Sequence, residues 1–209
     1  MSVTWLTTSG PLPHKAQGLW QYSAGNTDSF MGITLDEARE HLKKSSFDTN
    51  DNTLITEYIK SATRQAGTYM NRAVKVERWI LNLTEWPASG VIALSKGNYI
   101  SDLDVEYFDQ NNDAQILIYE TDYFYNQAAG VVYIKLKNTP PISDDLPLPI
   151  GITALYGWNA GVPDDVKGAI KLIVGDMYEV RQSKFSGNSV SEFPEYIQNL
   201  LNPYRLLSV

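Results

Sequence analysis

Four oxygen-bearing side chains in the middle of the chain have a spacing that could bind a cation. Asp109, Asn111, Asp113 and Glu120 occupy the first, third, fifth and twelfth positions of one stretch. Oxygen ligands at these positions, closed by a bidentate glutamate, hold calcium in EF-hand loops. The sixth position, where such a loop turns on a glycine, is Ala114, and the flanking residues alternate as strands do. A solvated hairpin turn also favours Asp and Asn, so we expect no metal here. If the chain does bind a cation, these four residues are the candidate ligands.

The sequence contains few residues of the types that carry out catalysis. The chain has no cysteine and two histidines, His14 and His41, which excludes thiolate nucleophiles and thiolate metal sites. Neither histidine lies near a Gly-x-Ser-x-Gly turn, and there is no Walker-type phosphate loop and no Gly-x-Gly-x-x-Gly. We therefore expect a protein that is not an enzyme and that needs no cofactor.

One row of carboxylates leaves a carbohydrate-related alternative open. Asp102, Asp104 and Glu106 alternate along one predicted strand and share a face. Two carboxylates can act as acid and base in glycoside hydrolysis, although such a row is usually the solvated side of a half-buried strand. Tyrosines of the same region could stack on a sugar, but alternation predicts that half of them are core residues. They are Tyr119, Tyr123, Tyr125 and Tyr133.

The negative charge is concentrated in the middle of the chain. The formal net charge is −7, and residues 73–162 carry eleven acids against five bases. No basic face that would grip a DNA backbone is visible, whereas an acidic surface lets DNA pass without adhesion. No apolar run reaches the roughly 18 residues of a membrane span, and the first residues lack the pattern of a signal peptide. We expect a soluble protein with no membrane contact.

Helical patterns stand at both ends of the chain, and strand patterns lie between them. Thr34 and Glu37 form a capping box that predicts a first helix. Apolar residues at three- and four-residue spacing predict a second helix after Asp51, and the two make a helical hairpin. The same spacing predicts helices over about 163–181 and 194–207.

From residue 74 the apolar period changes to two, which predicts strands. A proline-rich stretch over 139–149 cannot be a central strand and is predicted to be a loop. The predicted strands are 75–83, 91–94, 103–108, 115–119, 123–125, 131–136 and 150–156. The fold class is therefore α+β: a helical frame, made by the N-terminal helical hairpin and the C-terminal helices, with an inserted antiparallel β-lobe at about 74–157.

Residues 1–32 show no sustained period. We expect an N-terminal arm there that becomes ordered on assembly, and that docks its scattered aromatic residues on a neighbour. The domain proper is expected to cover 33–209.

From residue 33 to its C-terminus the chain resembles the head-to-tail connector proteins of tailed bacteriophages, also called adaptor or head-completion proteins. The matching segments occur in the same order as in the family and extend along most of the chain. The N-terminal arm is longer than is usual in the family. They are Ile33 to Leu42, Asp51 to Arg72, Trp79 to Trp86-Pro87, Val162-Pro163 to Ile170, Tyr178 to Arg181, and Leu200 to Arg205.

The resemblance implies a structural virion protein that forms a ring, commonly of twelve copies, under the portal of the capsid. The ring would join the DNA-filled capsid to a stopper or tail-completion protein, and genomic DNA would pass through it without sequence-specific binding. It would sit in the virion, at the head–tail neck, after assembly in the host bacterial cytoplasm. In the family the C-terminal segment often contacts the portal, which makes Tyr196, Leu200, Tyr204 and Arg205 the candidate contact residues. Plain packing of a last helix explains them as well.

Two alternative functions stay open at this point. One is a carbohydrate-binding or hydrolysing module of a phage tail, based on the acidic, tyrosine-rich region. The other is a different virion component, a stopper or tail-completion protein.

Overall fold

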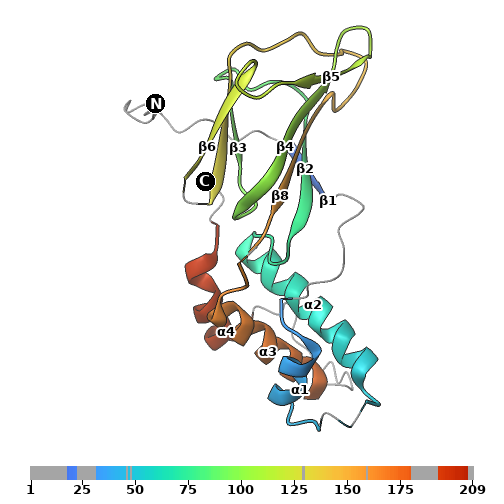
Figure 1. The fold of residues 1–209 in the computed structure, drawn as a ribbon, viewed down its shortest axis with the longest axis vertical. Helices are drawn as coiled ribbons and strands as arrows, with labels where there is room; N and C mark the ends of the chain where they lie inside the picture. Colours follow the sequence, from blue (N-terminus) through green and yellow to red (C-terminus); the bar gives the residue numbers. More distant parts are fainter. Residues whose placement is uncertain are drawn as a thin grey trace, which may run out of the picture.

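The computed structural model describes residues 18–22, 32–45, 47, 49–128, 130–158, 160–179 and 193–206. Within them, the helices gather at one end of an elongated molecule and the strands at the other (Figure 1). The helices are α1 (Leu35–His41), α2 (Asn52–Met70), α3 (Asp164–Glu179) and α4 (Glu195–Leu201), the last continued by a 3-10 turn, η1 (Asn202–Tyr204). The fold is mixed α+β, as predicted. No helix of the described residues is long and apolar enough to cross a membrane.

The predicted capping box begins α1. The Glu37 backbone N–H donates to Thr34 Oγ1 at 3.1 Å, and the Thr34 N–H donates to Glu37 Oε2 at 2.7 Å. These bonds satisfy backbone donors that a helix start leaves unpaired. The Thr34 backbone hydrogen bond also lowers the pKa of Glu37.

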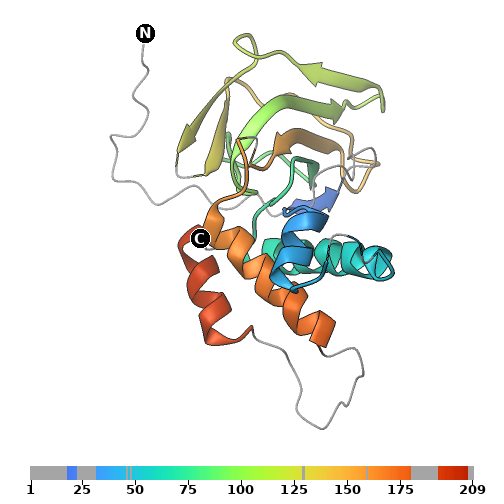
Figure 2. The same cartoon turned by 60° about the horizontal axis from the view of Figure 1, so that its bottom comes forward.

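The helices share one apolar core. Figure 2 shows α3 lying between α4 on one side and α1 and α2 on the other. Apolar residues three and four apart turn towards the common centre, and each fully buried aliphatic side chain there contributes about 1.5–3 kcal/mol. The buried residues are Ile55, Ile59, Ala62, Ala66 and Met70 of α2, Val166, Ala169, Ile170, Ile173 and Val174 of α3, and Ile197 and Leu201 of α4.

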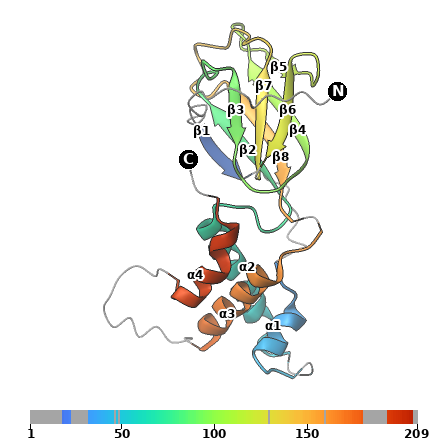
Figure 3. The same ribbon diagram turned by 90° about the vertical axis from the view of Figure 1, so that its left-hand side faces the viewer.

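The strands form two antiparallel sheets that enclose a second core. One sheet has the order β1-β2-β8-β4-β5 and the other the order β3-β7-β6 (Figure 3). Strict alternation along β8, where every second residue is buried, shows how one face of each strand turns inward. The strands are β1 (Gly18–Tyr22), β2 (Glu77–Leu83), β3 (Val91–Leu94), β4 (Tyr99–Phe108), β5 (Ala114–Leu117), β6 (Tyr123–Ala128), β7 (Val131–Leu136) and β8 (Ile150–Tyr156).

Strand β1 differs from the prediction, because residues 18–22 lie in the segment predicted to be an arm. They pair antiparallel with β2 in the same chain, with Trp20 opposite Leu81. The Trp20 ring packs edge-on against the buried Tyr156 at 6.2 Å. One aromatic residue of the predicted arm therefore docks on this chain's own sheet, whereas residues 1–17 and 23–31 of the arm lie outside the described residues.

The helices and the strands join where the segment between α2 and β2 lies against the turn between β3 and β4 and against the segment that leaves β8. The Ala73 N–H donates to the Lys96 carbonyl at 2.9 Å, and the Gly157 N–H donates to the Asn98 carbonyl at 2.9 Å. Gly157 has a φ of +136°, and a Cβ there would overlap the carbonyl oxygen of Lys75. The chain leaving β8 therefore passes against the chain entering β2 with no room for a side chain.

Replacing Gly157 by alanine tests this close passage, with Gly161 as a matched control. Gly161 also has a positive φ, +108°, but a Cβ there would meet nothing within 4 Å. We expect Gly161→Ala to lower the free energy of unfolding by about 1–2 kcal/mol, through backbone strain alone. Gly157→Ala should lower it by about 3 kcal/mol or more, since steric overlap adds to the strain. Urea unfolding measures both, and equal losses would contradict the close passage.

Candidate functional site

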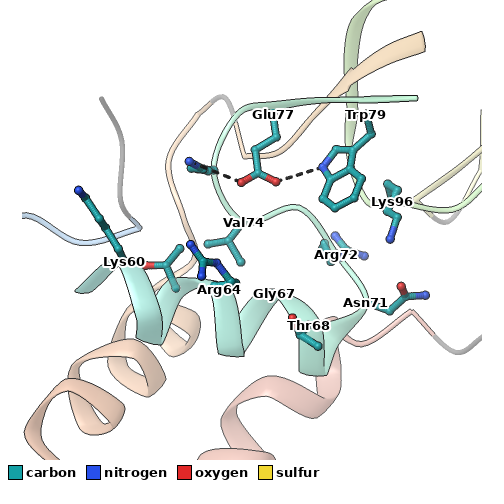
Figure 4. A pocket seen from close by; sticks show the side chains of 12 residues that line it. Lys60, Arg64, Gly67, Thr68, Asn71, Arg72, Val74, Glu77, Trp79 and Lys96 are labelled. Carbon is teal, nitrogen blue, oxygen red and sulfur yellow. Dashed lines mark hydrogen bonds and ion pairs between the residues drawn. The ribbon is translucent and has the colours of Figure 1, made fainter. Parts of the chain in front are cut away.

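A cleft opens at the junction, between the second half of α2 and the start of β2 (Figure 4). Its volume is about 570 Å³. The lining combines one face of α2 with the segment that leads into β2 and with the turn between β3 and β4. The lining residues are Lys60, Thr63, Arg64, Gly67, Thr68, Asn71, Arg72, Val74, Lys75, Glu77, Trp79 and Lys96.

Five of these residues are cations, and one is an acid, Glu77. This balance is opposite to that of the whole chain, which carries −7. A local cluster of one sign, recessed between low-dielectric walls, raises the local concentration of ions of the other sign. The cleft is therefore a candidate site for an anionic group.

The spacing along α2 places two of the cations at the cleft. Lys60 and Arg64 are four residues apart and lie on one helix face, while Ile59 and Ala66 face the core. Gly67 continues the cleft face without a side chain. A Cβ there would lie 3.0 Å from the carbonyl oxygen of Arg72, so the glycine lets the chain fold back closely after the helix.

The wall opposite α2 is an aromatic and charged cluster. Lys96 Nζ lies 4.5 Å from the ring centroid of Trp79 and 5.3 Å from that of Trp20. Trp79 Nε1 donates to Glu77 Oε2 at 3.0 Å, and Lys75 Nζ lies 3.8 Å from Glu77 Oε1. Burial raises the pKa of Glu77 and lowers the pKa of Lys96. An added anion would stabilise the charged forms of the partly desolvated cations in the cleft.

Glu77→Gln tests the electrostatics of this wall. A carboxyl with a raised pKa in the folded state binds more protons there than in the unfolded state, so its contribution to stability falls as pH rises between the two pKa values. Glutamine keeps an acceptor for Trp79 but does not ionise. We expect Glu77→Gln to gain stability relative to wild type as the pH rises above about 4, the ordinary pKa of a glutamate side chain.

Urea midpoints of both proteins across that pH range measure the effect. The exposed Glu85, just after β2, provides the control variant Glu85→Gln. A stability difference between Glu77→Gln and wild type that does not change with pH would contradict the assignment.

The four candidate partner-contact residues all lie on α4 and the segment after it. Tyr196 is 50% exposed, and its hydroxyl lies 3.5 Å from Asp176 Oδ2. Leu200 is half-buried against the helical core. Tyr204 packs edge-on against Trp158 and donates to Asp165 Oδ2 at 3.2 Å.

Arg205 is exposed and stacks over Tyr69, with its guanidinium carbon 5.2 Å from the ring centroid. The Tyr69 hydroxyl in turn donates to Asn202 Oδ1 at 2.8 Å. Leu200 and Tyr204 therefore hold the segment on the helical core, on α3 and on Trp158, whereas Tyr196 and Arg205 leave surface for a partner. Contact with a portal stays a prediction for all four.

Neighbouring residues of α4 separate a structural role from a surface role. We expect Ile197→Ala to lower the free energy of unfolding by about 2–5 kcal/mol, because Ile197 is fully buried. Tyr196→Ala should change it by about 0.5 kcal/mol or less. Thermal unfolding measures both variants. A large loss for Tyr196→Ala would show that this tyrosine stabilises the helix end and would weaken its candidacy as a contact.

Three of the four residues with cation-ligand spacing, Asp109, Asn111 and Asp113, lie in a hairpin turn between β4 and β5. Asp109 Oδ1 accepts the backbone N–H groups of Asn111 and Asp113 at 2.9 and 3.1 Å, and these bonds lower the pKa of Asp109. Glu120 lies in a separate turn, before β6. In the described part of the chain, no group of three or more histidine, aspartate or glutamate side chains could hold a metal ion.

The other chemical candidates are dispersed. His41 is exposed at the end of α1, and His14 lies outside the described residues. Tyr123 is buried, donates to the Leu103 carbonyl at 3.1 Å, and has its pKa raised to about 12 by burial. The Tyr119 and Tyr125 rings pack on each other at 5.1 Å. These tyrosines pack together and do not form a flat exposed row.

The cleft itself is absent from the sequence predictions. Its cations come from α2, from the junction and from the turn after β3, so no local motif unites them. The four-residue spacing of Lys60 and Arg64, opposite the apolar stripe of α2, is the one local signal that marks part of it.

No protein-family model matches the sequence, and no curated protein matches it. Solved structures do share its fold. A chain in the neck of an empty gene transfer agent (GTA) particle, computed with C6 symmetry, superposes with a TM-score of 0.73 at 15% identity. A chain in the virion of the native GTA particle gives 0.70, and one in the neck of the native particle computed with C12 symmetry gives 0.68, both also at 15% identity.

In each case the likeness covers 91% of this chain and 97% of the other chain. It therefore includes both the helices and the sheets. The resemblance to connector proteins that the sequence predicts is confirmed at the level of the fold: this chain has the fold of a chain from the neck of a gene transfer agent particle.

Proposed function

We propose that this chain is a structural subunit of a ring in the neck of a tailed virus or phage-like particle. The ring lies under the portal and joins the DNA-filled capsid to the stopper or tail. The observation that carries the proposal is the fold shared with a neck chain over 91% of this chain and 97% of that one. In this arrangement the helices are a frame, and the β-lobe is inserted into it.

A ring needs two different surfaces on each subunit that fit each other. The described surface offers unlike faces: the basic cleft beside α2 on one part, and the acidic strand β4 on another. The symmetries stated for the similar neck structures, C6 and C12, are rotational. They support a closed ring of this chain, and twelve copies is the expected number.

The charge distribution suits a channel for DNA. Residues 73–162 hold eleven acids and five bases, so the lobe repels a phosphate backbone more than it binds it. The sequence contains no cysteine and no Gly-x-Ser-x-Gly turn, and this motivates the proposal of a structural role. Tyr196 and Arg205, exposed on the C-terminal segment, are the proposed contacts with the portal.

Imaging of the purified chain with and without its portal protein tests the function. We expect rings, or ring-shaped caps on the portal, in negative-stain micrographs. A variant with Tyr196→Ala and Arg205→Ala should keep its fold and lose portal binding by about tenfold or more, because exposed aromatic and arginine side chains carry much interface energy.

Lys43→Ala, an exposed change on the loop after α1, is the control. If the wild-type chain forms neither rings nor a portal complex at high concentration, the proposed function is wrong. If the double variant binds the portal as wild type does, the ring proposal stands and the assignment of the contact residues is wrong.

A further inference from the structure

Charge is separated within this chain more sharply than its total suggests. Residues 97–158 contain nine acids and two bases, a net of −7 that equals the charge of the whole chain. The cleft beside α2 contains five bases and one acid. One subunit therefore carries both a strongly acidic surface and a basic recess.

The acidic surface includes an open sheet face. Asp104 and Glu106 are exposed on β4, and their neighbours across the strand pair are Thr153 and Gly151 of β8. A Cβ at Gly151 would have no neighbour closer than 4.0 Å, so the sheet is open beside Glu106. The described helices lie beyond one end of the strands and leave this face uncovered (Figures 1 and 3).

We propose that the basic cleft of one subunit binds the acidic β4 face of a second copy of this chain. This inference rests on the proposed ring and names the contact that closes it. Each copy presents the cleft to one neighbour and β4 to the other, as a head-to-tail interface requires. Lys60 and Arg64, on the cleft side of α2, pair with Asp104 and Glu106 of the neighbour.

Charge complementarity selects a second copy as the occupant. The cleft holds a surplus of cations, and burial lowers the pKa of both Lys96 and Arg72. Such partly desolvated cations are stabilised by carboxylates brought close. The acid-rich face of another subunit is present at high local concentration in any ring. Complementary charges of this kind fix partner choice and register more than they add raw affinity.

Duplex DNA suits the cleft poorly. The recess measures about 570 Å³ and lies between a helix and a strand, whereas a duplex presents its phosphates on a wide, rigid surface. The Trp79 ring, which could stack on a base, is covered by Lys96 at 4.5 Å. Single carboxylate side chains that project from a sheet face, such as Asp104 and Glu106, can each extend towards a recessed cation.

A charge reversal and its compensation test the inference. Arg64→Glu should raise the protein concentration needed for half-maximal ring assembly by about tenfold, because two acids then face each other across the interface. Lys43→Glu makes the same change of charge away from the cleft and should shift it by less than about twofold. The double variant Arg64→Glu with Glu106→Arg carries both halves of the swapped pair in every subunit, so it should assemble about as wild type does.

Sedimentation velocity, with portal added if the wild-type chain requires it, measures assembly, and circular dichroism checks each fold. If wild type forms rings and Arg64→Glu forms them equally well, the inference is overturned while the proposed function stands. If the double variant does not recover, the β4 face is not the occupant, and the inference is again overturned.

If wild type forms no ring with or without portal, the proposed function fails and the inference falls with it. Loss of salt-sensitive binding to duplex DNA by Arg64→Glu, with assembly unchanged, would assign the cleft to DNA and overturn the inference.

Discussion

Arg72 is the side chain on which the two halves of the molecule are joined. It follows directly after Asn71, which ends α2 in a left-handed conformation, and its side chain crosses into the β-lobe. There its guanidinium lies 5.4 Å from the ring of Trp158 and donates to Asn98 Oδ1 at 3.2 Å. A Cβ on Gly97 would lie 2.6 Å from its Cγ. One cation therefore ties together the end of α2, the turn before β4 and the exit from β8.

This junction sets the geometry that a ring subunit requires. With two separate cores, one helical and one of strands, a flexible connection would let the lobe swing against the helices. The stacked and bonded Arg72 holds it, helped by the Ala73 N–H, which donates to the Lys96 carbonyl at 2.9 Å. The basic cleft lies beside this junction. After α2 the chain turns back closely over Gly67, and Lys60 and Arg64 then line the cleft together with the start of β2. The junction that fixes the β-lobe on the helices is therefore also the place where the basic cleft forms.

The sequence predicts the parts whose pattern is local. The helix start at Thr34 and the apolar stripe of α2 follow from a capping box and from spacing, and β8 follows from alternation; all are confirmed. The five residues of β1 could not be predicted, because their order depends on pairing with a distant strand rather than on their own composition. The cleft could not be predicted for the same reason, because Lys60 and Lys96 line one cleft only after the strands have folded against the helices.

The central claim is that this chain forms the ring in the neck, and a single-particle reconstruction of the neck of particles that contain it tests that most directly. We expect a ring in which every subunit has this fold, with the cleft beside α2 against β4 of its neighbour and the C-terminal segment towards the portal. A neck ring built from a different chain, with this protein absent or elsewhere in the particle, would contradict the account.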